Sequence, residues 1–178
     1  MSTVGNVSAG NEQVWSEPGH TWAVVHTRPR CEKKVAAIAR LRGVHIYLPL
    51  RQTTHRYGGR ERRFSVPLFP GYMFCLSSDE ELRQLRQDRQ VANLLPVDDQ
   101  EALVHCLQSI DTALQVGDVA EVLPYLKEGQ VVRVRGGSLD GVEGVVERWV
   151  GKARIVINVE MLQQAVAIEM DAQDLVHL

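Results

Sequence analysis

The spacing of apolar residues changes about two-thirds of the way along the chain, and the change predicts two kinds of structure. Between residues 22 and 114, short runs of β-branched and aromatic residues alternate with segments whose apolar residues recur every three or four positions. This pattern is typical of strands interleaved with helices. From residue 128 onward, β-type runs follow one another, separated by glycine-rich or polar turns about every 8 to 12 residues. The second part is therefore predicted to be a small β-barrel of five strands.

Three helices are expected in the first part. The first would begin with Pro29, which suits the first helical position, and stop at Gly43. Serine or aspartate followed three residues later by glutamate forms a capping box, and this pattern opens the second helix at Ser78 and the third at Asp98. The third helix carries an apolar stripe at Leu103, Leu107, Ile110 and Leu114. Such a stripe must be buried, and we expect it to pack on the sheet of the first part.

The strands of the first part include a predicted hairpin and a predicted central strand. Residues Thr53 to Tyr57 and Glu61 to Val66 are strand-like runs joined by Gly58-Gly59, which is typical of a tight β-hairpin. Residues Phe69 to Leu76 are strongly apolar and are predicted to lie at the centre of a sheet. The fold class predicted for the first part is therefore α+β, an antiparallel sheet flanked by helices.

Composition predicts the boundaries of these parts. Residues 1–21 are rich in Ser, Gly and Asn without periodicity, which predicts a disordered leader. Residues 22–114 form the predicted α+β domain. Residues 115–127 lack periodicity and contain Gly117 and Pro124, so a flexible linker is expected there. Residues 128–178 form the predicted β-barrel, whose core is small enough to make it marginally stable alone.

Charge is distributed unevenly along the chain. The formal net charge is only −2, but Trp22 to Ser78 contains eleven Lys and Arg against two acids, Glu32 and Glu61. The rest of the chain is acidic. A basic block of this kind predicts a polyanionic partner. A solvated basic face without a partner is the alternative.

Motifs of enzymes, metal sites and membrane proteins are missing from the sequence. It contains no GxSxG, no phosphate-binding loop and no HExxH, its six histidines are scattered, and its three cysteines form no CxxC pair. Cys31 beside two lysines could be an activated thiol, but no histidine is placed to act as its base. We therefore expect no enzymatic activity, no cofactor and no metal. Without a membrane-spanning run of apolar residues, we expect a cytoplasmic monomer.

The predicted hairpin is crowded with arginine. Its cations are Arg51, Arg56, Arg60, Arg62 and Arg63. Like charges that face each other across paired strands cost stability. Neutralisation of phosphates offsets that cost, and the guanidinium fork suits phosphate geometry. Nucleic-acid contact is favoured over a merely solvated hairpin, which stays the alternative.

Two motifs, in this order and separation, resemble a known family. Gly129-x-x-Val-x-Val, followed by Gly136, Leu139, Gly141 and Gly144-Val-Val, resembles the KOW motif of SH3-like barrels. Upstream, Phe69-Pro70-Gly71-Tyr72 follows a basic hairpin, a helix and a Trp-led strand, which resembles the N-terminal domain of the NusG family of transcription elongation factors. The resemblance covers residues 22–178. It implies a non-enzymatic factor that binds RNA polymerase and suppresses pausing.

The resemblance also implies two sets of site residues. The set implied to bind the clamp helices of the polymerase β′ subunit is Phe69, Tyr72, Phe74 and His26. A core role for these aromatic residues is the alternative, and for Phe74 the two roles are equally open. The resemblance implies that Arg28, Arg30 and Lys34 contact non-template DNA and that the hairpin tip, Gly58, Gly59 and Arg60, faces upstream DNA. The arginine content of the hairpin adds Arg56 and Arg62 to the predicted nucleic-acid contacts. A ribosome contact through the KOW domain is a further implied partner.

Departures from the general factor favour a specialised, RfaH-like paralogue that opposes termination at selected operons. Arg83-Gln84-Leu85 and Leu162-Gln163-Gln164 stand where other members carry contact signatures. The C-terminal glycines and valines disfavour a helical alternative state, so we expect a constitutive barrel, flexibly tethered, that leaves Phe69 and Tyr72 open. A KOW-type RNA-binding or ribosome-associated module stays the alternative function, and a nuclease is disfavoured.

Overall fold

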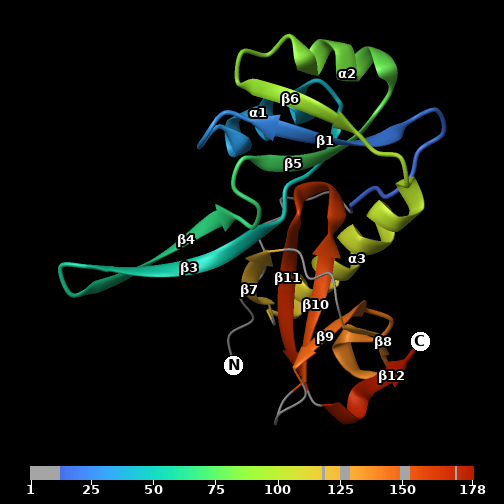
Figure 1. Cartoon of the computed structure of the whole chain (residues 1–178). Coiled ribbons are helices and arrows are strands. Elements are labelled where there is room, and N and C mark those ends of the chain that lie inside the picture. Colours follow the sequence, from blue (N-terminus) through green and yellow to red (C-terminus); the bar gives the residue numbers. More distant parts are fainter. Residues whose placement is uncertain (1–12, 118, 125–128, 149–152, 171) are drawn as a thin grey trace.

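The N-terminal part is built on a four-stranded antiparallel sheet with the order β2-β5-β1-β6. The computed structural model describes residues 13–117, 119–124, 129–148, 153–170 and 172–178 (Figure 1). The strands of this sheet are β1 (Thr21–Thr27), β2 (His45–Tyr47), β5 (Tyr72–Ser77) and β6 (Val91–Pro96). The central position of β5 was predicted from its apolar sequence, and the α+β fold class is confirmed.

Helices cover both faces of this sheet. The helices α1 (Glu32–Leu41) and α2 (Asp79–Arg86) pack on one face, where Val25 and Met73 share an apolar cluster with Val35 and Leu85. The helix α3 (Gln100–Val116) belongs to the cluster of the other face. Successive strand residues point to opposite faces, so the apolar runs of β1 and β5 supply both clusters.

Two predicted helix starts differ from the structure. Helix α1 begins at Glu32 rather than Pro29, because Arg30 takes a left-handed backbone (φ 64°) and the Cys31 amide bonds to the Arg28 carbonyl at 3.1 Å, which closes a turn first. Helix α3 is capped by Asp99 rather than Asp98, since the Asp99 carboxylate accepts from the Ala102 amide at 2.9 Å. The capping box at Ser78 is confirmed.

The predicted hairpin is confirmed and forms a sheet of its own. Strands β3 (Leu50–Tyr57) and β4 (Arg60–Pro67) pair only with each other within the described residues. Gly58 and Gly59 have φ of 55° and 80°, the backbone that a tight hairpin turn requires. Figure 1 shows this hairpin extending away from the rest of the molecule.

The C-terminal part is an antiparallel sheet with the order β12-β8-β9-β10-β11-β7. Its elements are β7 (Val119–Pro124), β8 (Gln130–Val134), β9 (Glu143–Arg148), β10 (Ala153–Val159), β11 (Gln164–Met170) and β12 (Leu175–His177), with 3-10 turns at Gly137–Leu139, Glu160–Leu162 and Ala172–Asp174. A small β domain, rather than a helical one, was predicted correctly.

The predicted linker contains regular structure. Strand β7 lies inside residues 115–127 and pairs with β11, so the sheet gains a strand beyond the five expected. Helix α3 ends at Val116 with Gly117 (φ 85°) as its C-cap, two residues before β7 begins. Residues 118 and 125–128 lie outside the described residues. The prediction of a structureless linker is therefore wrong over Val119–Pro124. This segment is ordered by backbone pairing with β11, which the pattern of apolar residues in the sequence does not indicate.

The predicted disordered leader is also partly ordered. Residues 1–12 lie outside the described part of the chain, but Trp15 packs against Trp22 and Tyr47 with ring centroids 5.9 and 5.3 Å apart. The Trp22 indole donates to the Trp15 carbonyl at 3.0 Å. The packing of Trp15 therefore holds residues 13–20 against the domain. The polar composition of this segment gave no indication of that contact.

Within the described residues, no helix is long and apolar enough to cross a membrane.

Candidate interaction surfaces

The Phe69-Pro70-Gly71-Tyr72 turn is held at Gly71 from both sides. The Gly71 amide donates to the Glu32 carboxylate at 2.7 Å, and the Gly71 carbonyl accepts from the Thr27 amide at 2.8 Å. Gly71 has φ of 85°, and a Cβ there would meet the His26 ring at 3.6 Å. Glycine is therefore required for its left-handed backbone, whereas a Cβ beside His26 would make only an ordinary van der Waals contact.

His26 and Tyr72 form a stacked pair beside this turn. They are partners in the register of β1 and β5, their ring centroids are 4.7 Å apart, and their planes meet at 16°. Both side chains are half-buried. Of the four residues implied to bind polymerase, these two present accessible ring surface in this conformation.

Phe69 and Phe74 are fully buried, and their rings meet edge to face at 6.2 Å. They belong to an apolar cluster that includes α3 and continues into the C-terminal sheet through residues such as Ile155 and Val166. The expectation of an open surface at Phe69 is wrong for this conformation. Strand alternation explains Phe74, since it points to the face that α3 covers.

Helix α3 joins the two parts of the molecule. Its Cys106 thiol donates to the Asn158 carbonyl of β10 at 3.2 Å, and burial raises the pKa of this thiol to about 12. On the rim, His105 lies 4.0 Å from Glu143, which also accepts from the Arg133 guanidinium at 2.6 Å. A cavity of about 490 Å³ lies along this junction. The apolar stripe of α3 therefore packs on both sheets, whereas only the first was expected.

The predicted nucleic-acid residues are all exposed. Arg28 and Arg30 lie in the turn before α1, and Lys34 lies in its first turn. The hairpin arginines Arg56, Arg60 and Arg62 are exposed as well. The ammonium group of Lys33 bonds to the Ser65 carbonyl, which ties α1 to the base of β4. Helix α1 is thereby linked to the base of the hairpin, whereas Arg56, Arg60 and Arg62 lie toward the hairpin turn.

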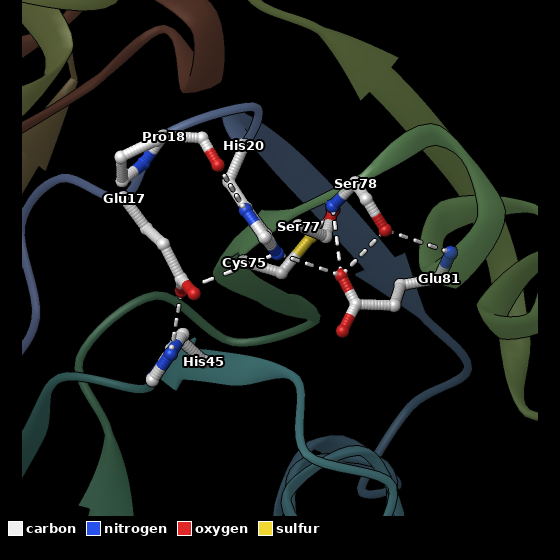
Figure 2. A network of polar contacts seen from close by, with 8 residues as sticks. All are labelled: Glu17, Pro18, His20, His45, Cys75, Ser77, Ser78 and Glu81. Atoms are coloured by element: carbon white, nitrogen blue, oxygen red, sulfur yellow. Dashed lines mark hydrogen bonds and ion pairs between the residues drawn. The ribbon is translucent and has the colours of Figure 1, made fainter.

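A polar cluster fastens residues 13–20 to the N-terminal sheet (Figure 2). His20 lies 3.2 Å from Glu81 at the start of α2, and Glu17 lies 2.9 Å from His45 of β2. Burial alone would raise the pKa of Glu81, but the hydrogen bonds from Ser78 and the charge of His20 outweigh it and lower the pKa. Among the described residues, no three His, Cys, Asp or Glu side chains are placed to hold a metal ion.

Sequence reasoning missed Glu32 and Thr27, the residues that hold Gly71. Glu32 is buried although it is an acidic residue, and it is one of only two acids in the basic block of residues 22–78. An acid isolated among cations is the signal that could have identified it. The contact between Cys106 and Asn158 had no signal in the sequence, because it joins residues 52 positions apart.

Comparisons with known proteins agree with these features. The family model for transcription termination factor NusG matches residues 20–112, more than half of the chain. The NusG transcription termination/antitermination proteins of Escherichia coli K12, Salmonella typhi and Yersinia pestis are each 26% identical over 139 residues, which is 71% of this chain and 74% of theirs.

Among solved structures, the MjSpt4:Spt5 complex in conformations B and A is similar at TM-scores of 0.29 and 0.27. The identity is 13% in both cases, the match covers 88% of this chain, and it covers 96% and 97% of those chains. The family model spans the sheet, the basic hairpin and the Gly71 turn described above. The chain belongs to the NusG family of transcription termination factors.

Proposed function

We propose that this protein is a transcription elongation and antitermination factor that binds the clamp helices of RNA polymerase and opposes pausing and termination at selected operons. The observation that carries this proposal is the Gly71 turn. Its backbone is held on both sides by Glu32 and Thr27, and it presents the stacked rings of His26 and Tyr72. A rigid aromatic surface of this kind suits the centre of a protein interface.

Phe69 and Phe74 lie buried in the apolar cluster against which Tyr72 packs, so they support the aromatic pair and do not themselves form the interface in this conformation. The basic residues adjoin the aromatic pair. Arg28 and Arg30 follow β1 directly after His26 and Thr27, so a polymerase bound at His26 and Tyr72 would bring nucleic acid within reach of these cations.

Co-purification with core RNA polymerase tests the aromatic surface. Tyr72→Ala is expected to weaken polymerase binding roughly thirtyfold, as truncation of a central aromatic anchor does. Leu41→Ala is the control, because it removes an apolar side chain that is 88% exposed at the end of α1 and belongs to no proposed surface. A folded Tyr72→Ala variant that binds polymerase as tightly as the unaltered protein would reject the surface.

A further inference from the structure

The two faces of the β3–β4 hairpin differ in chemistry. Residues opposite each other across an antiparallel pair share a face, so the register assigns every side chain. One face, called here the arginine–aromatic face, carries Arg51, Thr53, His55, Arg60, Arg62, Phe64 and Val66. The other, the polar face, carries Gln52, Thr54, Arg56, Glu61, Arg63 and Ser65.

Two side-chain contacts agree with this assignment. On the arginine–aromatic face, the rings of His55 and Phe64 lie 5.9 Å apart across the strands. On the polar face, Arg56 forms an ion pair with Glu61 at 3.4 Å. The hairpin's single acid therefore neutralises an arginine of the polar face, and the other face keeps three arginines with no acid among its described residues.

Phe64 is unusual in its exposure. It is 40% exposed, on a hairpin whose strands pair with no other strand in the described chain. An apolar ring on such a ribbon contributes little to a core. Set among Arg51, Arg60 and Arg62, it has the composition of a surface that binds single-stranded nucleic acid, where aromatic rings stack on bases and cations follow the phosphates.

We propose that the arginine–aromatic face of the hairpin binds an unpaired polynucleotide strand, with Phe64 and His55 stacking against bases and Arg60 and Arg62 contacting phosphates. The proposal deepens the nucleic-acid contact in the proposed function and rests on it for its setting in transcription. An unpaired strand fits better than a duplex, because the flat surfaces of paired bases are already covered by their neighbours in the stack. The polar face takes no part, so Arg56, which the sequence predicts as a nucleic-acid contact and which pairs with Glu61, is not among the contacts of this face.

Fluorescence anisotropy of the full-length protein with labelled strands tests the stacking. At about 50 mM salt, Phe64→Leu is expected to weaken binding to an oligothymidylate of about 12 nucleotides by about tenfold, since leucine keeps the apolar volume but cannot stack. On an abasic strand of equal length, which has the phosphates without the bases, the same variant should bind as the unaltered protein does. Equal losses on both strands would overturn the stacking role.

Neighbouring arginines test the choice of face. Arg62→Gln and Arg63→Gln remove the same charge from adjacent residues that point to opposite faces. Arg62→Gln should weaken binding several-fold and lower the slope of log affinity against log salt by about 0.7, the value for one phosphate of a single strand. Arg63→Gln should weaken it less than about twofold. Equal losses would show a diffuse electrostatic attraction and overturn the proposal.

Two further arms complete the test. A matched duplex should bind more weakly than the single strand and should not respond to Phe64→Leu, so tighter duplex binding would contradict the proposal. An oligouridylate beside the oligothymidylate distinguishes RNA from DNA as the source of the strand. Failure of the unaltered protein to bind any unpaired strand would reject this proposal alone, because polymerase binding is measured separately through Tyr72→Ala.

Discussion

The Gly71 turn and the β3–β4 hairpin are consecutive in the chain but are held in place by different means. The turn has two hydrogen bonds to other elements, and Phe69 beneath it is fully buried. The hairpin has strand pairing within itself and the bond from Lys33 to Ser65 at its base. Substitutions at the Gly71 turn are therefore expected to destabilise the fold, whereas substitutions of exposed side chains on the hairpin are expected to leave the fold intact.

Aromatic truncation should show the largest difference between these regions. Phe74→Ala removes a fully buried ring from the cluster beneath the turn and should lower the free energy of unfolding by about 3–5 kcal/mol. Phe64→Ala on the hairpin should lower it by less than about 1 kcal/mol, since that ring is 40% exposed. Chemical denaturation of both variants, followed by circular dichroism, measures the two losses.

Comparable losses would mean that the hairpin packs against the body of the protein and would break the comparison. A small loss for Phe74→Ala would mean that the cluster shared by the two sheets is not formed in solution.

The two acids of the basic block give a smaller and independent contrast. Glu32→Ala leaves the Gly71 amide without its buried acceptor and should cost about 1–3 kcal/mol of stability. Glu61→Ala removes only the exposed pair with Arg56 and should cost between about 0 and 1 kcal/mol. Because Glu32 orients the turn, its loss should also weaken polymerase binding, which co-purification reports. Retained polymerase binding in Glu32→Ala would show that the turn does not need this contact.

Local signals in the sequence were enough to predict the elements that depend on neighbouring residues. The Gly58-Gly59 turn and the Ser78 capping box are examples, because each is decided within four residues. The start of α3 was predicted one residue early, since Asp98 and Asp99 both qualify as caps by sequence and only the path of the chain selects Asp99. A helix start predicted from sequence is uncertain by one residue where two adjacent residues can both cap the helix.

Contacts between distant segments decided what the sequence could not. Phe69 was placed on an open surface because its motif is a surface motif, yet the cluster around α3 buries it. Strand β7 was taken for a linker because its order comes from pairing with β11, whose residues lie 40 to 49 positions further along the chain. Trp15 was assigned to a disordered leader for the same reason, as its partners Trp22 and Tyr47 lie outside that segment.

The smallest expected effect concerns Asp111, a half-buried residue of α3. Burial raises the pKa of this carboxyl, and the hydrogen bond that Gln115 donates at 2.7 Å opposes the rise. A raised pKa means that the folded state holds the proton more tightly than the unfolded state does. The stability that the protonated form contributes is therefore complete below the ordinary aspartate pKa and is lost as the pH rises through the folded value.

Asp111→Asn should consequently stabilise the protein at neutral pH and lose that advantage in acid, where the unaltered carboxyl is also neutral. The gain should be smaller than the loss in Glu32→Ala, because Asp111 is only half-buried and water screens its charge. Asp98→Asn is the control, since Asp98 is exposed near the start of the same helix and should show little change at either pH. Thermal unfolding at neutral and acidic pH measures both variants, and equal gains for the two would show that a general reduction of acidic charge, rather than burial against the sheet, is responsible.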